Sequence, residues 1–212
     1  MSKLKIVNLG LPKSGTTTLA RALQEAGLFV ADHRVRRDQC PVPEVRGTFV
    51  GAQIYAGYFD NGDPFGRLGF YDALTEISAL RKPLSLWPQC DYPLVKAMRD
   101  RHPDMKFVVT WRPAEAICDS MQRWGGLGQV RIPAATIPGL PHGFGAEFSE
   151  RIRWIEDNHA MLRDVFAGCR NFLQLDMAAP DARGQLAEFL GMDLPWWGRA
   201  NVNTDNPAKA AS

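Results

Sequence analysis

The chain has 212 residues, of which 45% are hydrophobic and 23% charged, and this supplies the core of one α/β domain. The formal net charge is only +2 and the cations form no basic run, which argues against a nucleic-acid-binding surface. No apolar stretch approaches the roughly 20 residues that a membrane-spanning helix requires. We expect one domain over residues 1–205 and a small polar tail at 206–212, with the oligomeric state left open.

The four cysteines indicate neither a zinc site nor a disulfide framework, because they lie far apart and form no Cys-x-x-Cys pair. The N-terminal residues run directly into an apolar strand pattern, without the h-region and cleavage site of a signal peptide. These features predict a cytoplasmic protein with reduced thiols and no metal. The cysteines are Cys40, Cys90, Cys118 and Cys169.

The first predicted element is a strand followed by a glycine loop and a helix. Lys3–Leu9 is an apolar run with β-branched residues, which predicts a buried strand. Gly10 and Gly15 break this pattern, and residues 17–26 resume with the spacing of an amphipathic helix. Backbone N–H groups of such a loop and of the helix start converge where the helix dipole also favours negative charge. The arrangement predicts a phosphate-binding loop.

The position of the lysine distinguishes this loop from the P-loop pattern Gly-x-x-x-x-Gly-Lys-Ser/Thr. Gly10 and Gly15 have the right spacing, but threonines follow them and Lys13 lies inside the loop. A lysine there would lie beside the terminal bridging oxygen of a nucleotide rather than over its last phosphate. A Gly/Ser turn before an ordinary helix would explain the two glycines, but not the lysine and the three consecutive threonines.

The run Pro12-Lys13-Ser14-Gly15-Thr16-Thr17 closely resembles the 5′-phosphosulfate loop of sulfotransferases that use 3′-phosphoadenosine 5′-phosphosulfate (PAPS). The resemblance implies that Lys13 assists the leaving 5′-phosphate, and that this phosphate is held by the neighbouring loop residues Pro12, Ser14, Gly15, Thr16 and Thr17. It also implies a three-layer, P-loop-like α/β fold, in which helices flank a central, mainly parallel sheet and irregular Gly/Pro-rich loops bind the substrate.

The segment after the first helix has little regular pattern. Phe29–Ala31 predicts a second strand, and His33 follows its end, where ligands bind in open parallel sheets; a solvated turn is the alternative for this histidine. Glycines and prolines punctuate residues 34–69, and only residues 42–58 have a helical period. Dense aromatic residues here either line an acceptor pocket or pack a loop-rich lobe. They are Phe49, Tyr55, Tyr58, Phe59, Phe65, Phe70 and Tyr71.

The centre of the chain alternates strand and helix patterns. Lys106–Trp111 is a clear apolar strand that ends in Arg112-Pro113, and Pro113 suits the first turn of a helix over 114–124. Weaker patterns predict an approach to the sheet at 69–76, a short strand at 82–87 and a helix at 94–101.

Arg112 and Ser120 match a second sulfotransferase signature, in which an arginine after a strand and a serine eight residues later bind the 3′-phosphate of PAPS. An arginine offers a permanently charged fork to a phosphate dianion, and a hydroxyl donates or accepts beside it. The alternatives are a surface salt bridge for Arg112 and a helix-face hydroxyl for Ser120. Together with the Lys13 loop, the pair resembles the family more closely than either residue does singly.

The last third begins with a Gly/Pro-rich segment. Residues 125–145 lack a regular pattern, and loops longer than about a dozen residues are usually lids, binding loops or disordered. We favour a lid over the acceptor, with Arg131 and His142 as contacts. A helix at 146–166 with His159 on its core stripe, a strand at 171–175 and a helix at 180–190 follow. Residues 191–197 and 201–203 resemble the close of the sulfotransferase domain.

The acceptor hydroxyl needs a general base. Cytosolic sulfotransferases use the histidine of a His-x-Pro step, and Asp91-x-Pro93 stands at nearly the same distance before Arg112. The resemblance makes Asp91 the candidate, and a partly desolvated carboxylate with a raised pKa would serve best. Alternatively, Asp91 caps the helix that begins near residue 94. The further candidates are Glu76, Asp72, His33 and His142.

These patterns predict a sulfotransferase that moves a sulfuryl group from PAPS to a hydroxyl or amine of a small-molecule or glycan acceptor, leaving adenosine 3′,5′-bisphosphate. Position and electrostatics would drive the transfer, so no metal is expected. The chain departs from the family in its short length, in Asp91 and in lacking the C-terminal Gly-Lys motif; it looks most like small bacterial sulfotransferase-like proteins. A P-loop kinase that binds Mg²⁺ through Asp176, or a non-catalytic nucleotide-binding module, is the alternative.

Overall fold

The central element of the fold is a five-stranded parallel sheet. The computed structural model describes residues 3–38, 40–198 and 200. Ile6 of the central strand β1 pairs with Ala73 on one side and with Lys106 on the other, and all four neighbouring pairs of strands are parallel. The strands in spatial order are β2 (Val30–Ala31), β3 (Ala73–Leu74), β1 (Ile6–Asn8), β6 (Lys106–Trp111) and β7 (Phe172–Asp176).

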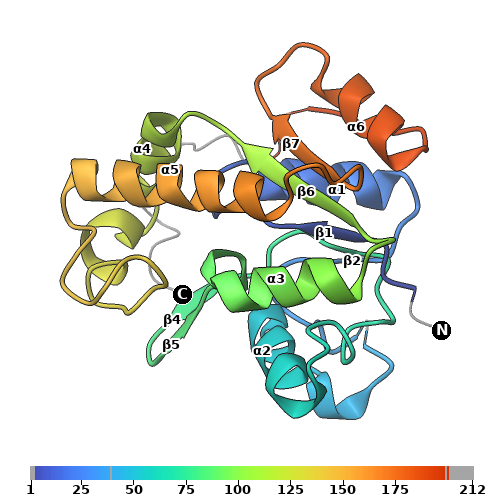
Figure 1. The fold of residues 1–212 in the computed structure, drawn as a ribbon, viewed down its shortest axis with the longest axis horizontal. Helices are drawn as coiled ribbons and strands as arrows, with labels where there is room; N and C mark the ends of the chain where they lie inside the picture. Colours follow the sequence, from blue (N-terminus) through green and yellow to red (C-terminus); the bar gives the residue numbers. More distant parts are fainter. Residues whose placement is uncertain (1–2, 39, 199, 201–212) are drawn as a thin grey trace.

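Helices cover both faces of the sheet (Figure 1). Val7 and Phe107 point to the face where α2, α3 and α5 pack, and Ile6 and Val108 point to the face of α1 and α6. Successive strand residues point to opposite faces, so β1 and β6 read as continuous apolar runs. The predicted three-layer α/β class is confirmed. The helices are α1 (Thr16–Glu25), α2 (Val50–Asn61), α3 (Tyr92–Arg101), α4 (Ala114–Gln122), α5 (Phe148–Val165) and α6 (Ala182–Leu190).

Two predicted elements differ from the structure. The helix expected over 42–58 is instead a 3-10 turn at Pro43–Val45 followed by α2, because Gly47 takes a positive φ of 73° between them. The strand expected at 82–87 is one arm of a hairpin outside the central sheet, formed by β4 (Ala79–Arg81) and β5 (Leu84–Leu86). The stretch 201–203 and the tail 206–212 lie outside the described residues.

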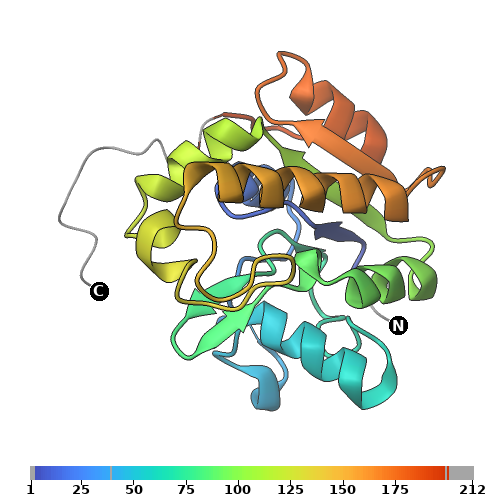
Figure 2. The same cartoon turned by 60° about the vertical axis from the view of Figure 1, so that its left-hand side comes forward.

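Residues 125–145 are better ordered than their Gly/Pro content suggests. They contain a π-helical turn at Leu127–Arg131 and a bridge between Ile137 and Leu140. Five of their apolar side chains are buried with those of α4 and α5 in a second core cluster that includes Trp154, whereas Val130 and Phe144 are exposed. The five are Leu127, Ile132, Ala135, Ile137 and Leu140. Figure 2 shows the segment beside the β4–β5 hairpin, where the Ser85 hydroxyl donates to the carbonyl of Thr136 at 2.8 Å.

Arg151 of α5 holds this segment in place from inside. Its side chain is only 1% exposed and has no acidic partner among the described residues. The guanidinium donates to the carbonyls of Gly128, Gly145 and Ala146 at 3.1, 2.6 and 2.7 Å, and to the Gln122 side chain at 2.7 Å. Removing it would leave several buried acceptors without a donor.

We therefore expect Arg151→Met to lower the free energy of unfolding by about 3 kcal/mol, because each buried group left unsatisfied costs about 1–3 kcal/mol. Urea titration followed by circular dichroism measures the change. Arg153→Met is the matched control, because Arg153 lies on the same helix but is exposed. Equal stability of the two variants would contradict the role given to Arg151.

Candidate functional site

An open cleft of about 2290 Å³ lies at the carboxyl ends of the parallel strands. Its lining includes residues that follow each strand of the sheet, and further walls come from the β4–β5 hairpin and from residues 127–142. The strand-end residues are Pro12, Lys13 and residues 15–18 after β1, Asp32 after β2, Thr75 after β3, Arg112 after β6 and Met177 after β7.

The glycine loop at residues 10–15 rests on a buried polar network. The Asn8 amide donates to the Thr75 carbonyl at 2.8 Å and accepts from the backbone N–H groups of Gly10 and Thr110 at 3.1 and 3.0 Å. The hydroxyls of Ser14 and Thr110 lie 2.6 Å apart. Asn8 thus joins the carboxyl ends of β3, β1 and β6 directly beneath the loop. A Cβ at Gly10 would lie 2.1 Å from Thr110 Oγ1, so only glycine allows this close approach.

The loop backbone is strained at Lys13. Its φ is 74°, and it is the one non-glycine residue of the described chain with a positive φ. Such a conformation costs about 1–3 kcal/mol and is usually kept for a functional reason. Gly15, two residues later, has a φ of 122° and its Cα lies close to Met177, where a Cβ would approach the side chain to 2.7 Å. The loop conformation therefore lowers the stability of the folded state.

The predicted donor-site residues lie together. Lys13, Arg112 and Ser120 all line the cleft, and the Arg112 guanidinium donates to the Lys13 carbonyl at 3.3 Å. Burial lowers the pKa of Lys13, and the nearby charges of Arg112 and Arg123 lower it further. The ammonium group lies 4.9 Å from the centre of the Trp124 ring. Neither Lys13 nor Arg112 has an acidic partner in the part of the chain that the structure describes.

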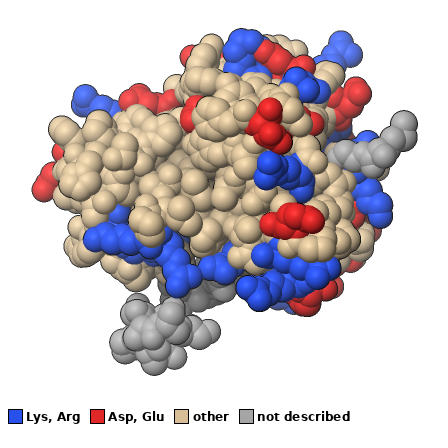
Figure 3. Space-filling view, turned by 90° about the horizontal axis from the view of Figure 1, so that it is seen from below, with Lys and Arg blue, Asp and Glu red and all other residues tan. Residues whose placement is uncertain are grey.

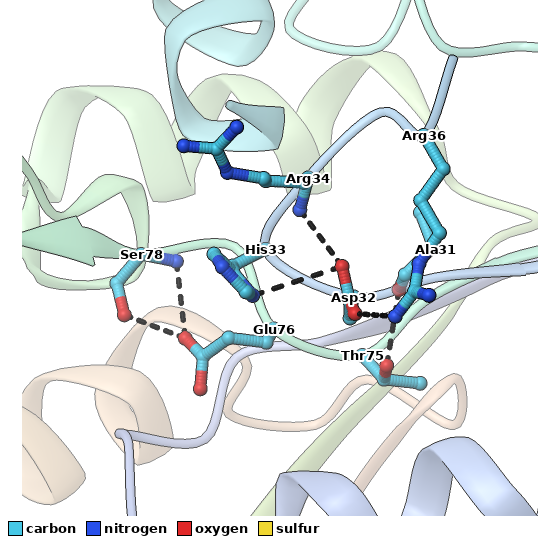
Figure 4. Close-up of polar contacts among 8 residues, drawn as sticks. All are labelled: Ala31, Asp32, His33, Arg34, Arg36, Thr75, Glu76 and Ser78. Carbon is cyan, nitrogen blue, oxygen red and sulfur yellow. Dashed lines mark hydrogen bonds and ion pairs between the residues drawn. The ribbon is translucent and has the colours of Figure 1, made fainter. Parts of the chain in front are cut away.

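Glu76 is the carboxylate that lies beside the loop. It follows β3, lines the cleft, and accepts hydrogen bonds from the Ser78 N–H and hydroxyl at 3.1 and 2.5 Å (Figure 4). Burial raises the pKa of Glu76 to about 7, although hydrogen bonds from Ser78 and from the Thr16 side chain oppose the shift. A carboxyl with this pKa is ionised in a large fraction of molecules at neutral pH and still basic enough to take a proton.

Asp32, at the end of the neighbouring strand, behaves differently. Burial alone would raise its pKa, but hydrogen bonds from the Arg36 side chain and the Arg34 N–H bring the pKa below the ordinary value. Figure 4 shows Arg36 folded back onto Asp32, at 2.6 Å, whereas the Arg34 guanidinium turns away. Two neighbouring carboxylates thus differ in basicity, and Glu76 is the more basic one.

The structure does not bring Asp91 to the cleft. Asp91 stands at the N-cap position of α3 and accepts a hydrogen bond from the Tyr55 hydroxyl at 3.3 Å, but it is not part of the cleft lining. Asp72 is also outside the lining, and its carboxylate accepts the Phe29 N–H at 2.8 Å. His33 and His142 line the cleft, and the His33 side chain is about half exposed; its partial burial lowers the pKa of His33 despite the neighbouring Asp32.

The aromatic residues of 49–71 mostly pack the core. Phe65 and Tyr71 are buried, and Tyr55, Tyr58 and Phe70 pack against the same cluster, whereas Phe59 is 79% exposed. Only Phe49 of this set is among the described residues that line the cleft. His159, as predicted, is buried in the core, and burial lowers its pKa to about 4.

Positive charge is concentrated in the cleft. Its lining includes nine Lys and Arg residues but only three Asp and Glu residues, although the whole chain has 25 cations against 23 acids. Figure 3 shows Lys and Arg gathered in a band along one edge of the face seen from below. The small net charge of the chain therefore hides a strongly cationic cavity, which favours anionic ligands.

Two residues of the site, Asn8 and Ser78, are not predicted by any sequence motif. Asn8 acts through hydrogen bonds to neighbouring strands, and Ser78 acts through its hydrogen bonds to Glu76. A polar residue that ends an otherwise apolar run, as Asn8 does, was the available signal.

Comparison of the chain with protein-family models and with curated protein sequences finds no match. Over residues 3–38, 40–198 and 200, no group of three or more His, Cys, Asp or Glu side chains is placed to hold a metal ion. No helix in the same ranges combines the length and the apolar character needed to cross a bilayer.

Proposed function

We propose that the protein is a PAPS-dependent sulfotransferase. The observation that carries this proposal is the adjacency in one cleft of two cationic sites, Lys13 in the glycine loop and Arg112 with Ser120, which have no acidic partner among the described residues. The 3′ and 5′ substituents of a ribose project from the same ring, so adjacent anion sites suit a doubly phosphorylated adenosine. Because Arg112 is linked to the loop through the Lys13 carbonyl, the two sites are held in a fixed relation.

The residues of the cleft have distinct roles in this proposal. When bound, PAPS supplies an activated sulfuryl group on its 5′-phosphate. The loop N–H groups and the hydroxyls of Thr16 and Thr17 hold the 5′-phosphate, and Arg112 with Ser120 holds the 3′-phosphate. Lys13 donates to the oxygen on which negative charge develops as the sulfur–oxygen bond breaks. The partly desolvated environment that lowers the pKa of Lys13 also strengthens this interaction.

Glu76 is the proposed general base in place of Asp91. It adjoins Thr16 of the loop, so an acceptor hydroxyl placed against the sulfuryl group would lie within its reach. The hydroxyl proton passes to the Glu76 carboxylate as the oxygen attacks. Asp91 instead occupies the N-cap position of α3, where its side chain makes no capping hydrogen bond.

The kinase alternative finds less support. Asp176, the proposed Mg²⁺ ligand, accepts the Ala178 N–H at 2.9 Å and is not among the described residues lining the cleft. In addition, Lys13 lies inside the glycine loop, whereas the lysine of the P-loop pattern follows the second glycine. A module that binds the nucleotide without turnover would share the donor site and differ only in lacking transfer.

Ligand-dependent melting distinguishes these functions. We expect adenosine 3′,5′-bisphosphate at about 100 times its Kd to raise Tm by roughly 5–10 °C, because it binds only the folded state. ATP with Mg²⁺ should raise Tm much less. AMP, which lacks the 3′-phosphate, should also raise Tm less than the bisphosphate does. In Arg112→Gln the bisphosphate should no longer raise Tm more than AMP does. In Arg183→Gln, a substitution outside the cleft, this difference in Tm should remain. Equal or greater stabilisation by ATP with Mg²⁺ would overturn the sulfotransferase assignment.

A further inference from the structure

The cleft extends well beyond the donor site. The sheet order places β6 and β7 on one side of β1, and β3 and β2 on the other. Lys13 after β1 and Arg112 after β6 form the donor half, so the acceptor half lies over the ends of β3 and β2, against Glu76. Small-molecule pockets usually measure about 300–1000 Å³, and this cleft of about 2290 Å³ leaves room for an acceptor beside a nucleotide.

The acceptor half carries its own set of cations. Arg34 follows β2, Arg81 and Lys82 lie at the tip of the β4–β5 hairpin, and Arg131 ends the π-helical turn; all four line the cleft. None of them has an acidic partner among the described residues, whereas Arg36 is neutralised by Asp32. In the proposed donor complex, Lys13 and Arg112 contact the phosphates of the nucleotide. Arg34, Arg81, Lys82 and Arg131 have no role in that donor site, whereas the other lining cations Arg21 and Arg123 pair with Glu25 and Asp119.

Two of these cations are held in place before any ligand binds. The Arg34 guanidinium lies 4.5 Å from the centre of the Phe49 ring and turns away from Asp32 (Figure 4). Arg131 donates to the Leu80 carbonyl and lies 5.5 Å from the centre of the Trp124 ring. The segment that carries Arg131 is in turn anchored by buried Arg151. Fixed side chains lose little entropy on binding, so they favour recognition of a specific group.

We infer that the acceptor is an anionic compound, in which the hydroxyl to be sulfated lies near a carboxylate, phosphate or sulfate group. This inference rests on the proposed function and adds the substrate class. Uncompensated like charges around one cavity repel one another and raise its positive potential, which an anionic ligand relieves. Arg34 and Arg131 bind the negative group of the acceptor, and the exposed hairpin cations Arg81 and Lys82 attract it from solution.

Binding of matched pairs of acceptors in the presence of saturating adenosine 3′,5′-bisphosphate tests the inference by calorimetry. The pairs differ in one anionic group: glucuronate and glucose, glucose 6-phosphate and glucose, and 4-hydroxybenzoate and phenol. At least one anionic member should bind about tenfold or more tightly than its neutral partner, as expected for one charge-assisted hydrogen bond. The preferred pair identifies the anion, and the advantage should shrink as salt is added.

Variants assign this preference to the four cations. Arg34→Gln and Arg131→Gln should each reduce the anion preference about tenfold, and the double variant Arg81→Gln/Lys82→Gln, at an exposed hairpin tip, should reduce it without affecting the fold. All should bind the bisphosphate as the wild type does, and Arg183→Gln serves as the control for loss of one surface charge.

The outcomes separate the two proposals. If the bisphosphate binds but every anionic acceptor binds no better than its neutral partner, the anionic-acceptor inference is overturned and the donor-site assignment stands. If the preference exists but survives in all three cleft variants, the assignment of the anion to Arg34, Arg131 and the hairpin cations is overturned. If the bisphosphate itself does not bind, both proposals fall together.

Discussion

Replacing Lys13 by alanine is expected to reduce sulfuryl transfer by about a thousandfold, the upper range for removing one donor that stabilises charge in a transition state. Lys13 lines the cleft and has no acidic partner in the described part of the chain, so in this proposal its charge is free for the leaving oxygen. Single-turnover measurements with saturating PAPS detect the loss. Arg112→Ala should act differently, mainly weakening nucleotide binding, because it holds a group that does not react.

The strain at Lys13 provides a second readout of the same position. A positive φ costs a lysine about 1–3 kcal/mol but costs glycine little. We therefore expect Lys13→Gly to be as inactive as Lys13→Ala and yet more resistant to urea than Lys13→Ala. Lys96→Ala, an exposed helical position paired with Asp100, is the control for loss of a surface lysine. Unchanged kinetics in Lys13→Ala would remove this residue from the mechanism.

Elements with a strong local pattern could be predicted from the sequence. The apolar run and glycine break around Gly10 place β1, the loop and α1, and β6 spans the predicted residues Lys106–Trp111. These strands are specified by continuous apolar runs, and the loop by the glycines that interrupt the pattern. The part of the cleft around Lys13 and Arg112 consists almost entirely of such elements, which is why the sequence could predict that these residues lie close together.

The acceptor half depends on contacts between distant segments. β3 has only two residues, and its place beside β1 is a long-range parallel pairing that no local pattern reveals. Glu76 follows that short strand, so its position at the loop could not be read from its neighbours. Asp91 was selected by its distance from Arg112 along the chain, but spacing along a sequence does not determine which way a helix start faces. The packing of residues 125–145 could not be predicted either, because their buried side chains follow no helical or strand period.

Replacing Glu76 by glutamine is expected to reduce turnover by about 10²–10⁴-fold, the usual contribution of a general base, while leaving nucleotide binding intact. If Glu76 is the base, kcat/KM of the wild-type protein should rise with pH to a plateau above a midpoint near 7, because burial raises the pKa of Glu76 to about 7 and only the carboxylate accepts a proton. Initial rates from pH 5 to pH 9 measure both effects.

The same ionisation predicts how stability varies with pH. The folded state holds a proton on Glu76 up to about pH 7, whereas the unfolded chain releases it near the ordinary value of 4.5. The free energy of unfolding should therefore fall as the pH rises between these values, by up to about 3 kcal/mol. Glu76→Gln cannot ionise, so it should lack this decline and be more stable than the wild type at pH 8. A decline of equal size in both proteins would assign the effect to other groups.

Two further variants decide which carboxylate acts as the base. Asp91→Asn should keep its activity, because Asp91 lies outside the cleft lining; loss of turnover in this variant, with Glu76→Gln active, would reverse the assignment. Ser78→Ala removes the hydroxyl hydrogen bond that stabilises the ionised form of Glu76 and keeps the one from the backbone N–H, so the midpoint of the kcat/KM profile should move to higher pH. A purely structural Glu76 would leave that midpoint where it is, since no proton transfer would then depend on this carboxyl.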